Sequence, residues 1–594
     1  MNIHSRFWWQ HRMKDHRNLG AYFDGENFSI TVWAPLHDQI LYKSVKGRET
    51  EMDKKGEYFF LKLDESVDGD LYTLDIDGTI LPDPLSRFQP TGVAGPSMLV
   101  NTSKYKWSAA RWEDHPVDDH IIYEMHIGTF SPEGTYRAAE NKLQYLKDLG
   151  VTALEIMPLS QSYGSRNWGY DGVFPFAPSY SYGTPSDLAH FIDKCHMLGL
   201  SCFLDIVYNH LGPIGNVFPS FAPYFSNKYS TPWGQAVNLD GAYSGGVREM
   251  LLANLSYWIE DFHFDGFRMD STQNIYDSSP RHFLSEVTAH VQSLSSRLGR
   301  KVVMIAESDK NDASIIRPAE KCGLGFDAEW ADDLHHAFHS YTTGERTGYY
   351  LDYGNLSDIA YVLEHGYLYD GKYSNYLKAV RGTDFSGEKP SSLVVALQNH
   401  DQIGNRALGE RIASLVSFEN LKLGASVFLL APFTPMIFMG EEYGETSPFW
   451  FFMQTDDRKF AENVNMGRKR EFKDFDWPNK IRDPSSIDAF LESKLQWKDN
   501  TQNRCILTLY RDLIQVRKDF IQRSDRLGWK VSSYGNIIRI FYPKTRLGVL
   551  HNFGSVPIEV SGSVILNTSS EKYGGSNTNP RIIAEPGSVL TIQS

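Results

Sequence analysis

The chain has 594 residues, of which 41% are hydrophobic and 22% are charged, a balance that excludes wholesale disorder. Its 59 Lys and Arg residues against 73 Asp and Glu residues give a net charge of −14, which argues against a basic surface for nucleic acid. No uncharged run of about 18 apolar residues occurs, and the N-terminal stretch lacks the apolar core of a secretory signal. We therefore expect a cytoplasmic protein with no nucleic-acid or membrane partner.

The N-terminal part of the chain predicts a domain of antiparallel strands. Strand-like runs at 29–35, 58–63 and 71–78 are separated by turn residues. We expect residues 1–105 to form an N-terminal β-sandwich of the immunoglobulin-like kind.

From about His120 onward, strand-like segments alternate with helical ones. Amphipathic stretches predict helices at 138–149, 186–198, 247–262 and 281–298. Eight strand-like runs accompany them, at 121–127, 153–159, 200–208, 264–270, 301–307, 326–330, 392–398 and 434–440. This pattern favours a parallel (β/α)8 TIM barrel over residues 106–523. An open doubly wound sheet is the alternative, but no GxGxxG follows the first strand to support it.

The helical pattern ends near Arg523. Short strand-like runs follow at 537–543, 548–554, 563–567 and 588–594, between Gly, Asn, Ser and Pro residues. Residues 524–594 are therefore expected to form a small all-β domain. The predicted fold class is α/β, a TIM barrel between an N-terminal β-sandwich and a C-terminal β domain.

Polar side chains gather at the carboxyl ends of four predicted barrel strands. They are Asp205, Asn209 and His210 after the third strand, Arg268 and Asp270 after the fourth, Glu307 after the fifth, and His400 and Asp401 after the seventh. Each acid alone could be a loop residue or a helix cap. In a TIM barrel, however, these ends converge on the face where active sites lie. The agreement of four strand ends predicts an active site there.

These residue types suit the cleavage of a glycosidic bond, which needs one ionised carboxylate and one protonated carboxylic acid. Arg268 lies two positions before Asp270, so both side chains point to the same side of a strand, and the Arg would keep the Asp ionised. Asp270 is therefore predicted to be the nucleophile. Glu307 is then the natural acid/base, and Asp401 is the third acid.

Four short segments resemble the shared regions of the α-amylase superfamily of glycoside hydrolases. They are DIVYNH (205–210), GFRMD (266–270), the Glu of IAESD (305–309) and QNHD (398–401). The resemblance implies a retaining mechanism on α-glucosidic bonds, with Asp270 as nucleophile, Glu307 as acid/base and Asp401 holding hydroxyls of the distorted sugar. Together with an aromatic loop after the second strand, it predicts these substrate-binding residues: Trp168, Tyr170, Asp171, His210, Arg268, Asp309, His400 and Gln402.

Longer segments, among them 82–97, 325–350 and 398–411, are similar to one group of α-glucan hydrolases within the superfamily. One departure follows the nucleophile, where that group usually has Ala-Val-His and this chain has Ser-Thr-Gln at 271–273. The contact made by the His is therefore in doubt. Asp309, Asn311 and the loop Thr446–Phe449 are expected to shape the leaving-group side and so to select the substrate.

Two other functions stay open at this point. A glucan branching enzyme would have a similar N-terminal domain and barrel, and it would differ in its product, which carries new α-1,6 branches. A non-catalytic sugar-binding protein on a degenerate barrel predicts the loss of at least one catalytic acid, and all three are present.

We expect no cofactor and no metal. His335, His336 and His339 could suggest a metal site, but no carboxylate at a metal-binding spacing accompanies them, so a polar helix face near the cleft is favoured. Asn209 matches a calcium ligand of the superfamily, yet a Ca²⁺ site needs about six to eight oxygens and no second carboxylate cluster supplies them. The expected partner is an α-glucan substrate, with no obligatory protein partner.

Overall fold

The computed structural model describes residues 18–109, 115–475, 481–524, 528–576 and 583–593. Within these ranges, every helix is too short or too polar to cross a membrane. The chain divides into two compact units, the first made of the described residues of 1–114, 133–141 and 156–304, and the second made of 115–132, 142–155 and the described residues from 305 onward. The domain bounds expected from the sequence stay a prediction.

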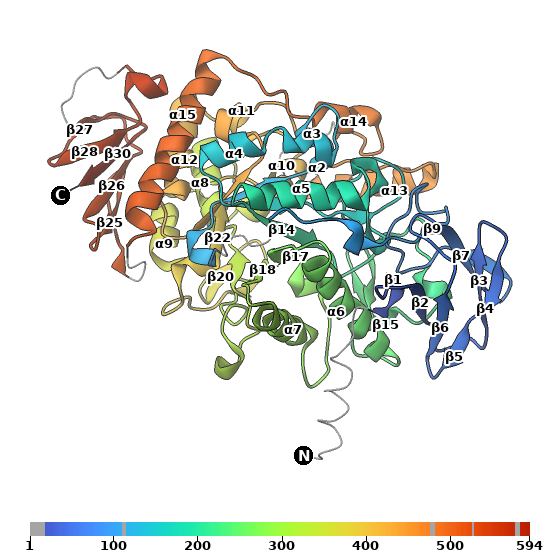
Figure 1. Ribbon diagram of the computed structural model, residues 1–594. Helices are drawn as coiled ribbons and strands as arrows, with labels where there is room; N and C mark the ends of the chain where they lie inside the picture. Colours follow the sequence, from blue (N-terminus) through green and yellow to red (C-terminus); the bar gives the residue numbers. More distant parts are fainter. Residues whose placement is uncertain (1–17, 110–114, 476–480, 525–527, 577–582, 594) are drawn as a thin grey trace. The chain divides into compact units, whose positions relative to one another are not determined.

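The N-terminal strands of the first unit form two antiparallel sheets (Figure 1). One sheet has the order β1 (Gly20–Phe23), β2 (Phe28–Trp33), β6 (Tyr58–Leu63) and β5 (Asp53–Lys55). The other has the order β4 (Glu49–Glu51), β3 (Ile40–Ser44), β7 (Leu71–Ile76) and β8 (Thr79–Leu81), with β9 (Ser97–Met98) paired to β7. The N-terminal antiparallel fold is confirmed.

The eight strands expected in the central region close into a parallel barrel. In order they are β10 (Ile122–Met125), β11 (Ala153–Ile156), β14 (Ser201–Ile206), β17 (Gly266–Met269), β18 (Val303–Glu307), β19 (Ala328–Trp330), β22 (Leu393–Ala396) and β23 (Thr434–Phe438). Most of their residues are buried on both faces, as parallel strands between helices require. The TIM barrel is confirmed, and the doubly wound alternative is wrong because the sheet is closed.

Helices lie at the four places that the periodicity predicts. The stretch 138–149 is divided into α3 (Tyr136–Glu140) and α4 (Leu143–Leu149), and the other three are α5 (Pro185–Met197), α6 (Ser244–Glu260) and α7 (Phe283–Leu298). Further helices that were not predicted are α8 (Asp333–Thr343), α9 (Leu356–His365), α12 (Phe418–Leu429), α13 (Arg458–Glu471) and α15 (Thr501–Val516). A capping box between Thr184 and Asp187 starts α5, because each side chain accepts the other residue's backbone N–H. α4 ends at Gly150, whose φ of 104° favours glycine.

Two connections between barrel strands carry hairpins. The strands β15 (Phe225–Thr231) and β16 (Gly234–Val237) form one hairpin between β14 and α6, and β20 (Lys372–Ser374) and β21 (Ala379–Arg381) form another between α9 and β22. The first hairpin belongs to a connection at the carboxyl end of a barrel strand, and such connections are the usual carriers of specificity in this fold.

The C-terminal segment of the second unit forms an antiparallel sheet, as the sequence predicts. Its order is β24 (Lys530–Tyr534), β25 (Ile537–Tyr542), β26 (Leu547–Asn552), β30 (Ser588–Gln593) and β28 (Ser563–Asn567). The sheet is attached to the end of α12. The buried Lys422 donates to the carbonyl of Thr568 at 2.9 Å, and the Tyr542 hydroxyl donates to the carbonyl of Leu430 at 2.7 Å.

In the first unit, the N-terminal sheets pack against α6. Trp33 of β2 lies over Gly246, where an added Cβ would come within 2.1 Å of the indole ring. The Tyr58 hydroxyl donates to Glu249 of the same helix at 2.6 Å. The glycine is therefore needed for the close approach of strand and helix.

We predict that Gly246→Ala lowers the free energy of unfolding by about 1–3 kcal/mol, because overpacking outweighs the usual gain of Ala over Gly in a helix. Gly467→Ala in α13 is the matched control, since an added Cβ there meets nothing within 4 Å. The control should raise stability by about 0.5–1 kcal/mol. Thermal and denaturant unfolding measure both, and equal gains for the two variants would contradict the packing of Trp33 on Gly246.

Candidate functional site

The centre of the site in the first unit is an ion-paired triad at the ends of β14 and β17. Asp205 and Arg268 are register partners in the two parallel strands. Arg268 Nη1 donates to Asp205 Oδ2 at 2.6 Å and to Asp270 Oδ1 at 2.9 Å. The Arg268 side chain is fully buried, and that of Asp270 is 10% exposed. The expectation that Arg268 and Asp270 point to the same side is confirmed.

Asn209 holds the second oxygen of Asp270. Its Nδ2 donates to Asp270 Oδ2 at 2.6 Å and to the Asp270 carbonyl at 3.0 Å. Its Oδ1 faces Nδ1 of His210. Burial lowers the pKa of His210 to about 4, so this imidazole is neutral near pH 7. Both ends of the Asn209 amide therefore have partners, Asp270 at Nδ2 and His210 at Oδ1.

The aromatic loop after β11 contributes Tyr170 to the triad. Its hydroxyl donates to Asp205 Oδ2 at 2.6 Å, and the ring lies 5.8 Å from the Arg268 guanidinium. Trp168 is only 2% exposed and meets Tyr170 edge to face at 6.4 Å. Asp171 accepts from Asn167 at 2.7 Å. Of the expected sugar platforms, Tyr170 is the half-buried one, and Trp168 supports it from below.

The departure from the relatives' pattern lies directly after Asp270. Ser271 has a φ of 44°, a left-handed conformation that is costly for a non-glycine residue. A short 3₁₀ turn, Thr272–Asn274, follows it. Gln273 Oε1 is buried and accepts no hydrogen bond within the described part of the chain. Gln273, where the sequence predicts a departure from the family's His, therefore keeps a buried acceptor three residues after Asp270.

Glu307 ends β18 in the second unit. It is half-buried, whereas Asp309, two residues later, is exposed. Asn311 is buried, with a φ of 53°, and its Nδ2 donates to Asp333 at 2.6 Å. Asn311 thus anchors the loop, and only Asp309 of this pair keeps a surface for a ligand. In the loop Thr446–Phe449, Phe449 is likewise fully buried, and Thr446 is exposed.

His400 lies between two carboxylates at the end of β22. Its Nδ1 contacts Glu124 Oε1, its backbone N–H donates to Glu124 Oε2 at 3.1 Å, and its Nε2 lies 3.4 Å from Asp401 Oδ1. Glu124 belongs to β10 and is 1% exposed. Our sequence reasoning missed Glu124; the available signal was a carboxylate inside an apolar strand.

A further acid, Asp332, was also missed. It follows β19, and its Oδ1 accepts from Gln402 Nε2 at 2.9 Å. Burial, followed by the negative charges of Glu307 and Asp401, raises the pKa of Asp332 to about 7. The Gln402 side chain therefore binds Asp332, and Gln402 itself is 6% exposed.

The three histidines of α8 form a buried aromatic cluster, so the expectation of a polar helix face is wrong. His335, His336 and His339 are 4%, 8% and 2% exposed. His335 contacts the Leu397 carbonyl and the Tyr350 hydroxyl, and burial lowers the pKa of His336 to about 3. Within the described residues, no group of three or more His, Cys, Asp or Glu side chains could hold a metal ion.

The two hairpins supply exposed aromatic residues that the sequence did not single out. Trp233, at the turn between β15 and β16, is 52% exposed and stacks on His210 with ring centroids 5.0 Å apart. In the other hairpin, Tyr373 is 55% exposed. Solvent-exposed rings beside buried polar groups are suited to sugar faces.

Comparison with known proteins identifies the family of the chain. The family described as "Alpha amylase, catalytic domain" matches residues 82–230 and 242–524. Malto-oligosyltrehalose trehalohydrolase from Saccharolobus solfataricus is 43% identical over 505 residues, covering 84% of this chain and 87% of the relative. The Mycobacterium tuberculosis enzyme of the same name is 39% identical and covers 85% and 89%. A crystal structure described as an alpha amylase from Salmonella typhimurium has a TM-score of 0.88 at 34% identity, covering 97% and 99%.

The chain therefore belongs to the alpha-amylase family of glycoside hydrolases and, within it, to the malto-oligosyltrehalose trehalohydrolase family. The segments 82–97, 325–350 and 398–411 carried this same resemblance in the sequence. The branching enzyme GlgB of Geobacillus stearothermophilus is also similar, but at 26% identity.

We predict that Asn209→Ala lowers kcat for glycosidic cleavage by roughly 10–100-fold with a smaller change in KM, because one oxygen of Asp270 loses its donor only 2.6 Å away. Steady-state kinetics on the purified variant measure this. Asn216→Ala is the control, since its amide donates to the Gly212 carbonyl and not to the triad. Equal changes in kcat for the two variants would contradict a role of the Asn209–Asp270 hydrogen bond in cleavage.

Proposed function

We propose that this chain hydrolyses the α-1,4-glucosidic bond next to the terminal trehalose of malto-oligosyltrehalose. The products are trehalose and a shortened malto-oligosaccharide. The observation that carries the chemistry is the buried Arg268, which pairs with Asp270. The similarity to enzymes of that name over 75–85% of this chain supports the substrate.

In this proposal Asp270 is the nucleophile. Its Oδ oxygens are held by Arg268 and Asn209, so the carboxylate is ionised and fixed before the substrate arrives. One of these oxygens attacks the anomeric carbon, and the glycosidic C–O bond breaks. A covalent glycosyl ester forms, as in retaining enzymes.

Glu307 is proposed as the acid/base. Its carboxylic acid gives a proton to the departing oxygen of the trehalose unit, and its carboxylate then takes a proton from the water that hydrolyses the ester. Asp270 leaves with its charge restored, and the sugar keeps its α configuration. Asp270 and Glu307 follow neighbouring strands of the closed barrel, β17 and β18, which supports this assignment.

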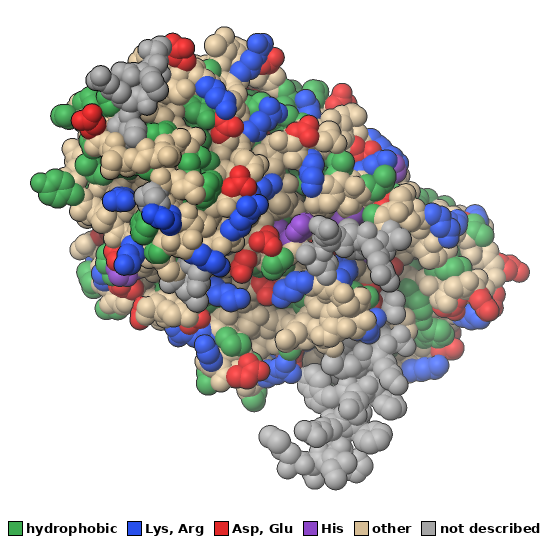
Figure 2. All heavy atoms as spheres, turned by 60° about the vertical axis from the view of Figure 1, so that its left-hand side comes forward, with side chains coloured by type: hydrophobic (Ala, Val, Ile, Leu, Met, Phe, Trp, Pro, Cys, Tyr) green, Lys and Arg blue, Asp and Glu red, His purple; other side chains and the backbone are tan. Residues whose placement is uncertain are grey.

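The other polar groups are proposed to bind the sugar. Asp401 accepts from hydroxyls of the reacting glucose, Tyr170 stacks on its ring, and His210 and His400 take further hydroxyls. Trp233 extends the aromatic surface beyond His210. No step needs a cofactor, and the cytoplasmic location stays a prediction from the sequence. On the face drawn in Figure 2, acidic and basic side chains are interspersed, which fits a neutral substrate better than a nucleic acid.

We predict that Asp270→Asn and Glu307→Gln each lower the release of trehalose from malto-oligosyltrehalose by at least about 10³-fold, because each removes a bond-making or proton-transferring group. Product analysis measures the loss. The melting temperature is the control for folding, and Glu320→Gln is the matched control, an exposed acid in the connection between β18 and β19. Turnover within a few-fold of the parent in either catalytic variant would contradict the assignment.

Product identity tests the substrate itself. Incubation with malto-oligosyltrehalose should give free trehalose and an initially α-configured oligosaccharide, whereas amylose should give no new α-1,6 branches. An initial β-anomer would overturn retention. New branches would favour the branching-enzyme alternative.

We predict that Asp332→Asn moves the alkaline limb of the kcat/KM profile to lower pH by about 0.5–1 unit. The pKa of Asp332 is raised to about 7, so this side chain carries its negative charge mainly above neutral pH, beside Glu307. Removing that charge makes it easier for the protonated Glu307 to ionise, and the acid is lost earlier as the pH rises. Glu320→Gln is again the control. An alkaline limb that stays in place or moves to higher pH would contradict the electrostatic coupling between Asp332 and Glu307.

A further inference from the structure

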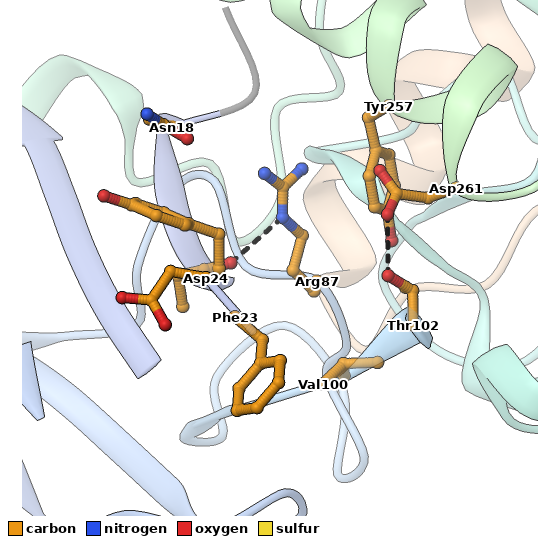
Figure 3. Close-up of a pocket in the computed structure, with 10 residues that line it drawn as sticks. Asn18, Phe23, Asp24, Arg87, Val100, Thr102, Tyr257 and Asp261 are labelled. Carbon is orange, nitrogen blue, oxygen red and sulfur yellow. Dashed lines mark hydrogen bonds between the residues drawn. The ribbon is translucent and has the colours of Figure 1, made fainter. Parts of the chain in front are cut away.

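Two hollows lie side by side in the first unit, away from the triad. One, of about 420 Å³, is lined by residues 18 and 21–24, by Arg87 and by the end of α6 (Figure 3). The other, of about 410 Å³, is lined by parts of 98–106 and the start of α5. They share Val100, Thr102 and Asp261, and the Thr102 hydroxyl donates to Asp261 at 2.6 Å. We call the pair the sandwich groove.

Arg87 brings an unused hydrogen-bond donor to the groove. The residue is 4% exposed, and its Nε and Nη2 donate to the carbonyls of Ala21 and Leu19. Its guanidinium lies between the rings of Phe176 and Tyr257, 4.4 and 4.2 Å from their centroids. In the described part of the chain, neither Arg87 Nη1 nor the Tyr257 hydroxyl has a hydrogen-bond partner. Buried polar groups of this kind are costly unless a ligand satisfies them.

The charges that line the groove cancel. Three acids and three bases contribute: Asp24, Asp68 and Asp261 against Arg87, Lys104 and Lys106. Lys104 is paired with Asp68 at 2.9 Å. The first hollow also lies at the carboxyl end of α6, where the helix dipole adds partial negative charge. This balance disfavours a phosphate or another anion and favours a neutral ligand.

The remaining lining combines rings with groups that donate and accept. Tyr22 and Phe23 are half-buried in the first hollow, and Tyr105 is half-buried in the second. A sugar offers apolar ring faces to such side chains, and each of its hydroxyls both donates and accepts. Two hollows that share one wall suit a ligand of several sugar units rather than a single one.

We propose that the sandwich groove is a second, non-catalytic binding site for a neutral oligosaccharide. The identity of that saccharide as an α-glucan rests on the proposed function, whereas the preference for a neutral sugar rests on the groove alone. Arg87 Nη1 and the Tyr257 hydroxyl bind hydroxyls of the ligand, and Tyr22 packs on a ring face.

The test uses the full chain carrying Asp270→Asn, which prevents turnover, and maltoheptaose as the probe. Amide hydrogen exchange should slow in residues 18–24 and 97–106 as the sugar is added. Tyr22→Ala should weaken this protection about fivefold, while Tyr22→Phe should keep it, because the ring face carries the interaction. Val100→Trp should abolish the protection, because the larger side chain fills space in both hollows. Tyr534→Ala, an 86% exposed tyrosine in β24, is the matched control and should leave it unchanged.

The proposal is overturned if saturating maltoheptaose leaves both segments unprotected. It is also overturned if the Tyr22→Ala and Val100→Trp variants, each with a melting curve like that of the parent, show the same protection of these segments as the parent. Protection by inorganic phosphate in place of the sugar would also overturn the proposal, because it would show that the groove is an anion site. Trehalose release by the unsubstituted chain is measured separately. Release without protection would refute the groove alone, and protection without release would refute the proposed function alone.

Discussion

The side chains at the ends of β14 and β17 depend on one buried guanidinium that forms ion pairs with two carboxylates. Arg268 has no exposed surface, and its partners Asp205 and Asp270 are 1% and 10% exposed at their side chains. Burial of this set is tolerable because Arg268 pairs with both carboxylates and two further hydrogen bonds support them, from Tyr170 to Asp205 and from Asn209 to Asp270. The arrangement follows from register, since Asp205 and Arg268 are partners across β14 and β17, and Arg268 and Asp270 share one side of their strand. The Asp270 carboxylate is thereby held in a fixed orientation by Arg268 and Asn209.

Raised pKa values alone do not locate the chemistry in this chain. Burial raises the pKa of Glu441 to about 8 and that of Glu442 to about 7, close to the value for Asp332. Glu441 and Glu442, however, are almost fully buried and accept hydrogen bonds from tyrosine hydroxyls, Tyr510 for the first and Tyr123 and Tyr145 for the second. Both side chains therefore satisfy buried hydroxyls in the core of the second unit. Asp332 differs because its neighbours are Glu307 and Asp401, two acids at strand ends, so its charge affects groups that the substrate would meet.

The sequence predicted the parts of the fold and site that depend on local pattern. Strand and helix periodicity placed all eight barrel strands, and the i, i+2 spacing placed Arg268 beside Asp270. It could not place Glu124 or Asp332, because their roles come from contacts over long sequence separations, such as the 276 residues between Glu124 and His400. The α8 histidines show the opposite error. Their polar residue type suggested a polar helix face, whereas tyrosines about 15 residues later in the chain, among them Tyr350, enclose the rings. Burial by a distant segment leaves no local signal.

The residues that follow Asp270 are those for which the resemblance to the family predicts a departure from its usual pattern. Ser271 takes a left-handed conformation that an alanine would accept no more easily, so the backbone strain belongs to the turn and not to the residue. The strain is sustained because the Asp270 backbone is fixed on both sides, by its N–H to the Ile206 carbonyl at 3.0 Å and by its carbonyl to Asn209. Gln273 then stands where an imidazole is usual, with a buried acceptor available. An amide can both donate and accept without titrating, so a substrate contact made through Gln273 would not depend on pH in the way that a contact through His does.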